Sequence, residues 1–173
     1  MVTKKGNMKR FFLVAAIVAA GFTANAQKES AGIEGFKIQG GINLGIPANH
    51  MGGSSFVAGV DLLGQYGVSE NFGITVDAGF SAIFLKSPAD PKTESLIPIR
   101  VGVRYYPASN YYFGGKVGVG ILAYDGHSTS TTAYSFGGGY MVTPKIDLGA
   151  SYDGYSKNGS FGLINVRIAY TLN

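Results

Sequence analysis

The stretch Leu96-Ile97-Pro98-Ile99-Arg100-Val101-Gly102-Val103-Arg104-Tyr105-Tyr106-Pro107 has two opposite faces if it forms a β-strand. Side chains of a strand alternate with a period of two, so one face carries only apolar residues and the other carries Arg100 and Arg104. An arginine cannot lie in a dry core without partners. The stretch therefore predicts one strand of a closed membrane barrel, apolar outside and charged inside, in which the other strands supply the neutralising carboxylates.

The first 26 residues have the order of a secretory signal peptide. Four basic residues within positions 4–10 precede an apolar run over 11–22, and Ala24-Asn25-Ala26 supplies the small residues of a cleavage site. The run is shorter than the ~20 residues that a membrane-spanning helix needs, although an uncleaved anchor is the alternative. We predict cleavage after Ala26, a short periplasmic tail over 27–35 and a barrel over 36–173.

The remaining chain is electrically balanced and poor in charge. Four of the 14 Lys and Arg residues lie in the leader, which leaves ten basic residues against ten acidic ones and gives no argument for a nucleic-acid partner. The chain has no Cys, which excludes a disulfide framework and a lipid anchor on cysteine. Low charge, in a whole chain with 27 Gly and 11 Tyr, suits a transmembrane barrel.

Period-two alternation predicts eight strands of about 11 residues, the length that crosses a bilayer when tilted. The expected strands are 36–46, 55–66, 72–85, 96–107, 111–124, 133–142, 145–155 and 161–172. The connectors 47–54, 86–95, 125–132 and 156–160 are longer or more polar than the three tight turns between them. The fold class is therefore all-β, an eight-stranded antiparallel up-and-down transmembrane barrel with its longer loops outside and both termini in the periplasm.

Aromatic residues gather near both ends of the expected strands, as in the girdles of a membrane barrel. Ordinary strand propensity is the alternative explanation. The expected girdle residues are Tyr66, Phe72, Tyr105, Tyr106, Tyr111, Tyr112 and Tyr170 near the tight turns, and Phe56, Phe80, Phe84, Tyr124, Tyr134, Tyr152, Tyr155 and Phe161 near the loops.

Charged residues of six strands share the non-lipid face at similar depths. The interior of an eight-stranded barrel is just wide enough for side chains to fill it. We therefore predict an ion-pair network in the lumen, with glycines at Gly102, Gly118 and Gly120 making room for the long arginine side chains. Its members are Arg100, Arg104, Lys116, Arg167, Asp61, Asp77 and Asp147. A plugged lumen is the structural interpretation and an ion or proton path the functional one; the small bore favours the plug.

A soluble barrel with the apolar face turned inward would show the same alternation. Its outer surface would then carry one or two charges per strand and much Gly, which is a poor surface for water. The membrane barrel explains the pattern better.

The sequence contains no pattern that fixes a catalytic, metal or cofactor site. His50 and His127 lie on expected outer loops, and a hydrolase or acyltransferase built with nearby Ser and Asp is conceivable. The candidate partners are Ser54, Ser55, Asp125 and Ser128. No motif sets their spacing, so we expect a protein that is not an enzyme and that binds no metal and no cofactor.

Four features carry a resemblance to a known group: the leader, the turn and strand Val68–Ile74, the segment Ile99–Tyr106 and the final expected strand. Over nearly all of 36–172 the chain resembles the small eight-stranded outer-membrane barrels of Gram-negative bacteria, the OmpA/OmpX-like and porin-family group. The resemblance implies a monomer that reaches the outer membrane through periplasmic chaperones and the barrel assembly machinery and contacts outer-membrane lipids. It implies a role in envelope integrity or surface adhesion, with a narrow pore as the alternative and an outer-leaflet lipid-modifying enzyme as a third hypothesis.

Overall fold

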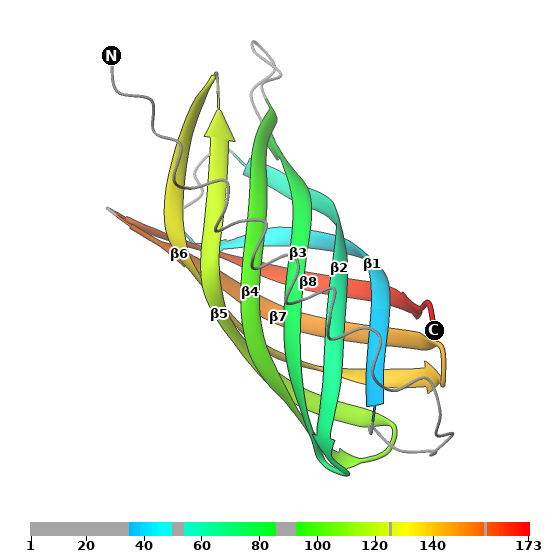
Figure 1. Cartoon of the computed structure of the whole chain (residues 1–173). Helices are drawn as coiled ribbons and strands as arrows, with labels where there is room; N and C mark the ends of the chain where they lie inside the picture. Colours follow the sequence, from blue (N-terminus) through cyan, green and yellow to red (C-terminus); the bar gives the residue numbers. More distant parts are fainter. Residues whose placement is uncertain (1–34, 50–53, 86–92, 125, 158) are drawn as a thin grey trace, which may run out of the picture. The chain divides into compact units, whose positions relative to one another are not determined.

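The barrel is seen in a computed structural model that describes residues 35–49, 54–85, 93–124, 126–157 and 159–173. These residues form eight strands in one closed sheet, in which each strand pairs antiparallel with the next and β8 pairs with β1 (Figure 1). The strands are β1 Gly35–Asn49, β2 Ser54–Ser69, β3 Phe72–Leu85, β4 Thr93–Ala108, β5 Tyr111–Tyr124, β6 His127–Thr143, β7 Ile146–Ser156 and β8 Ser160–Thr171. The predicted fold class is confirmed.

Within these ranges, no helix has the length and apolar character needed to cross a membrane. The predicted signal peptide, the tail up to residue 34 and His50 lie outside the described residues.

The hairpin of β5 and β6 differs from the prediction. Residues 127–132, expected in a loop, form the start of β6, and Tyr124 pairs directly with His127. The two residues between them are Asp-Gly, the strongest short signal for a two-residue hairpin turn, and Gly126 has φ +77°. Three of the next residues are Thr, which favours strand. The predicted loop 125–132 is therefore wrong, and the connectors at the loop end are not uniformly long.

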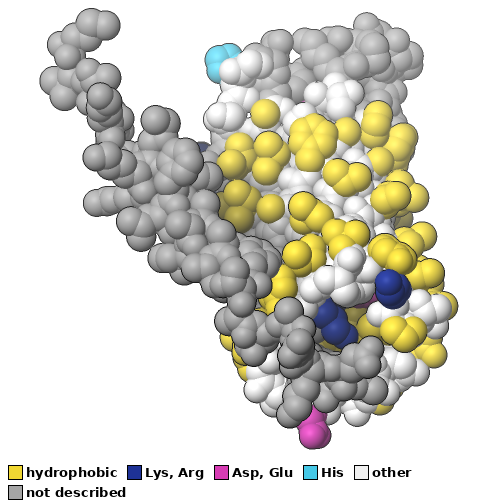
Figure 2. Space-filling view, turned by 45° about the vertical axis from the view of Figure 1, so that its right-hand side comes forward, with side chains coloured by type: hydrophobic (Ala, Val, Ile, Leu, Met, Phe, Trp, Pro, Cys, Tyr) yellow, Lys and Arg dark blue, Asp and Glu magenta, His cyan; other side chains and the backbone are white. Residues whose placement is uncertain are grey.

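The outer face of the barrel is apolar on every strand, as the alternation predicts. Val101 and Val103, between the inward arginines of β4, are 54% and 53% exposed. Figure 2 shows hydrophobic side chains in a broad band over the visible wall. Such a band is stable where hydrocarbon covers it and costly in water.

The lumen contains two kinds of layer. We call the end with connectors 70–71, 109–110 and 144–145 the turn end, and the opposite end the loop end. Polar and charged side chains fill the turn end and the middle. Toward the loop end lies a cluster of buried apolar side chains, here called the apolar layer: Val57, Ile83, Leu96, Ala133, Tyr155 and Leu163. This layer was not predicted from the sequence.

Among the side chains that the structure describes, four of the expected girdle aromatics lie inside the barrel. Tyr106, Tyr112 and Tyr155 are 2%, 7% and 2% exposed, and Phe161 packs on the apolar layer against Tyr155, so the girdle prediction is wrong for these four. For Tyr106 and Tyr112 the reason is the alternation of side chains along a strand, because the neighbouring Tyr105 and Tyr111 take the outward positions. Other expected girdle residues near the turn end, such as Tyr66 and Tyr170, are exposed on the wall.

Candidate functional site

The candidate site is the charged part of the lumen, and Arg100 on β4 lies at its middle. Arg100 stands opposite Asp77 of β3 in the strand register, and its Nη2 and Nε donate to Asp77 Oδ2 at 2.6 and 3.2 Å. Its Nη1 lies 3.1 Å from Asp153 Oδ2 on β7, an ion pair without hydrogen-bond geometry. One buried guanidinium therefore joins two walls of the barrel.

Lys116 on β5 shares the carboxylate of Asp77, two strands away. Its Nζ lies 3.3 Å from Asp77 Oδ2. The side chain passes over Gly102 of β4, where an added Cβ would come 2.7 Å from Lys116 Cγ. Gly102 thus makes room for a long cationic side chain, as the sequence analysis proposed for the inward glycines, although the side chain is a lysine.

Arg167 on β8 reaches across β1 to Asp61 on β2. Its Nη2 and Nε donate to Asp61 at 2.6 and 2.9 Å in a two-point contact, and Asn43 Nδ2 donates to the same carboxylate. The crossing point is Gly41, where an added Cβ would lie 2.7 Å from Arg167 Nε. No side chain longer than hydrogen fits there while Arg167 keeps this path.

The turn end of the lumen is closed around Arg104 and Asp147. Arg104 Nη1 lies 3.4 Å from Asp147 Oδ2, and its guanidinium carbon stands 4.1 Å from the ring centroid of Tyr112. The Tyr112 hydroxyl donates to Asp147 Oδ1 at 2.9 Å. Gln65 accepts hydrogen bonds from Arg104 and from the Tyr106 hydroxyl. The layer is thus held by a cation, a carboxylate, an amide and two phenols.

Asp153 is the residue that the predicted network lacks. It accepts hydrogen bonds from Ser135 at 2.6 Å, Asn165 at 2.8 Å and Ser151 at 3.0 Å, besides facing Arg100. A signal was present in the sequence, because Asp153 lies six residues after Asp147 and so on the same face of the strand. The inward amides of Gln39, Gln65, Asn43 and Asn165 could have been found in the same way.

The described lumen therefore balances four cations with four carboxylates. Each of the seven predicted network residues lies in the lumen within 3.4 Å of an oppositely charged atom, and Asp153 completes the set. Two cavities of about 50 and 20 Å³ lie beside these side chains. A cavity of this size holds one to a few waters. The arrangement can neutralise charge and hold water, and it presents no free carboxylate pair for acid–base work.

In the described part of the chain, the residues of the hydrolase hypothesis do not form an assembled site. His50 and Asp125 lie outside the described residues. Ser54 and Ser55 begin β2, while His127 and Ser128 begin β6, so His127 is a strand residue and not a loop residue. Among described residues no group of three His, Asp or Glu side chains is arranged to hold a metal ion.

Comparison with known proteins gives a family and a fold. Residues 13–171 match the family model described as the outer membrane protein beta-barrel domain. The fold is similar to that of Ail, the attachment invasion locus protein of Yersinia pestis, with TM-score 0.58, 17% identity and coverage of 80% of this chain and 99% of that one.

Two further solved structures are similar in the same way. Neisserial surface protein A gives TM-score 0.54 and 17% identity over 83% of this chain and 99% of its own. The N-terminal β-barrel domain of Pseudomonas aeruginosa OprF gives TM-score 0.57 and 10% identity over 79% and 97%. At these sequence identities, the comparison shows that the fold is shared. The comparison with curated proteins gave no match.

Proposed function

Because this chain belongs to the outer membrane protein beta-barrel family, and is an integral protein of the bacterial outer membrane, we propose that it acts as a non-catalytic barrel with a plugged lumen. Its role is structural or one of surface contact, in envelope integrity or adhesion. The observation that carries the proposal is the packing of the lumen, in which a neutral ion-pair network lies beneath the apolar layer.

The two layers oppose ion passage for different physical reasons. In the network, every cation already has a carboxylate partner, so moving an ion through it requires breaking buried pairs. In the apolar layer, side chains such as Leu96 and Leu163 offer nothing to replace the water of a hydrated ion. Tyr155 seals this layer further, because its ring stacks on Phe161 with centroids 4.9 Å apart.

The loop end supports surface contact. The start of β6 carries His127, Ser128, Thr129 and Ser130, all exposed. These polar side chains would face the exterior above the lipid-facing band. Ail is titled an attachment invasion locus protein, and the shared fold makes adhesion a reasonable role for this surface.

A narrow pore is the second candidate function. The two cavities beside the network favour it, since space large enough for water lies next to charged side chains. The pore would require the apolar layer to open.

Single-channel recording of the refolded full protein in planar bilayers tests the plug. We expect no steady conductance from the wild type or from Arg100→Ala. We expect conductance from a variant that carries Tyr155→Ala and Leu163→Ala, which removes two large side chains of the apolar layer. Ile164→Ala, on the lipid-facing side of the same strand, is the matched control and should stay silent. A steady open channel in the wild type would refute the plugged lumen and favour the pore.

The surface role needs a separate measurement in cells. Cells that display the barrel should adhere to protein-coated surfaces better than cells lacking it, and Ser128→Lys with Ser130→Lys should reduce that adhesion. If the role is envelope integrity, loss of the barrel should instead raise sensitivity to detergent. No change in either assay would contradict both forms of the proposal.

A further inference from the structure

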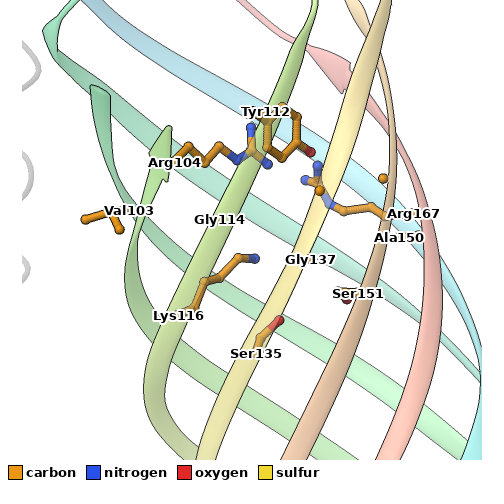
Figure 3. Close-up of a pocket in the computed structure, with 12 residues that line it drawn as sticks. Val103, Arg104, Tyr112, Gly114, Lys116, Ser135, Gly137, Ala150, Ser151 and Arg167 are labelled. Atoms are coloured by element: carbon orange, nitrogen blue, oxygen red, sulfur yellow. The ribbon is translucent and has the colours of Figure 1, made fainter. Parts of the chain in front are cut away.

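The larger of the two cavities beside the network, of about 50 Å³, is lined on its polar side by cations. Among the described residues that line it are Arg104, Lys116 and Arg167, and no carboxylate. Figure 3 shows these three side chains pointing toward the same space from β4, β5 and β8. The remaining lining is largely small, with Gly114, Gly137 and Gly149 among its residues, and it includes the outward-facing Val103 and Ala150 of the wall.

The carboxylates that pair with these cations are not among the residues that line the cavity. Arg167 contacts Asp61 at 2.6 Å, and Arg104 contacts Asp147 at 3.4 Å. Lys116 has one partner among the described residues, Asp77 at 3.3 Å, although an ammonium carries three donors. Donor capacity therefore remains on the cavity side of the network.

The hydroxyl groups near the cavity are already engaged as donors. Ser135 and Ser151 donate to Asp153, and Tyr112 donates to Asp147. A molecule in the cavity would therefore be held mainly by the cationic side chains, which favour a negative charge between them over a neutral occupant.

We propose that this cavity binds a small monovalent inorganic anion, of the size and charge of chloride, between Lys116, Arg104 and Arg167. The volume admits a few waters or one such ion. The bound anion would accept hydrogen bonds from donors of the three cations that the four carboxylates of the lumen leave free. This site is independent of whether the apolar layer is closed, so it stands apart from the proposed function.

Bromide is the probe, because its anomalous scattering locates it. Crystals of the full protein grown in sodium bromide should show an anomalous peak in the cavity for the wild type. In solution, the thermal midpoint of the detergent-solubilised protein should be higher in sodium bromide than in sodium gluconate at equal ionic strength. Losing a charge-assisted contact in Lys116→Met should weaken bromide binding roughly tenfold or more.

Two further variants keep the test decisive. Lys157→Met removes the same charge from an exposed position after β7 and should retain the bromide effect. Gly149→Ala keeps every charge and takes up cavity space, with its Cβ 3.3 Å from the Tyr112 hydroxyl, and should weaken the effect if Lys116→Met does not fold. Bromide peaks confined to the surface, or a midpoint difference that Lys116→Met and Gly149→Ala leave unchanged, would overturn the proposal. Failure of the anion proposal would not change the expectation that the wild type shows no steady conductance in planar bilayers.

Discussion

At the scale of single residues, the contact of Arg167 with Asp61 shows why the lumen depends on matched charges. Both side chains are largely buried, and the guanidinium meets the carboxylate at two points. Their attraction is offset by the cost of removing both charges from water. The pair therefore contributes little net stability, yet either member alone would be a buried and uncompensated charge.

This asymmetry predicts the outcome of a double-variant experiment. Asp61→Leu should lower the free energy of unfolding by about 3–5 kcal/mol, because Arg167 is left without its closest partner. Adding Arg167→Met should restore most of that loss, since the stranded cation is then gone. Urea titration of the refolded protein in lipid vesicles, followed by far-UV circular dichroism, measures both. A double variant as unstable as the single one would show that the loss comes from packing and not from charge.

At the scale of strands, glycines decide which side chains can span the lumen wall. Arg167 crosses β1 at Gly41, and Lys116 crosses β4 at Gly102. Tyr112 of β5 crosses β6 in the same way, since a Cβ on Gly139 would lie 2.4 Å from its hydroxyl. Each crossing brings a long side chain to a carboxylate two strands away. The inward glycines thus set the connectivity of the ion-pair network.

Neighbouring glycines on β1 allow a matched test of this role. Gly41→Val should lower the free energy of unfolding by about 1–3 kcal/mol, because the new side chain overlaps Arg167. Gly40→Val faces outward, with Leu62 Cδ2 4.0 Å from its Cβ, and should leave stability unchanged or raise it through strand propensity. Urea titration of the two variants side by side measures the difference. Equal effects would mean that Arg167 finds another path to Asp61.

At the scale of the whole molecule, closure of the sheet leaves one wall that faces outward everywhere. β1 pairs with β8, so the described sheet has no free edge along the middle of the barrel. Large apolar side chains on all eight strands then form the outer face. The alternation of side chains along each strand therefore decides which residues face the lumen and which face outward.

This inside-out arrangement predicts a dependence on depth for charges placed on the wall. Val101→Arg, near the middle of β4, should lower the free energy of unfolding in lipid vesicles by about 2–4 kcal/mol. Tyr105→Arg, near the turn end of the same strand, should lower it by about 0–1 kcal/mol because the side chain reaches the interface. A larger penalty at Tyr105 than at Val101 would mean that the lipid-facing band is placed wrongly along the barrel.

The pairing of Arg100 with Asp77 could be anticipated, because both lie inward at similar depth on adjacent strands. The second partner of Arg100, Asp153, could not be selected in the same way, since it lies across the lumen on β7. The dipeptide Asp125-Gly126 is a clear turn signal in the sequence. The Ser and Thr residues that follow were predicted as part of a loop, although they begin β6. The inward position of Tyr112 followed from parity with Tyr111, but end-of-strand aromatics suggested a girdle.

The amino-acid order by itself determined the strand count, the outward apolar face and the inward charges, because side-chain alternation along a strand is a local property of the backbone. The partners across the lumen, the crossings at Gly41 and Gly102, and the apolar layer were decided only by the tertiary structure. These features depend on register and on closure between β1 and β8, which bring together residues more than a hundred positions apart, such as Asp61 and Arg167. No local pattern records which residues meet at that distance.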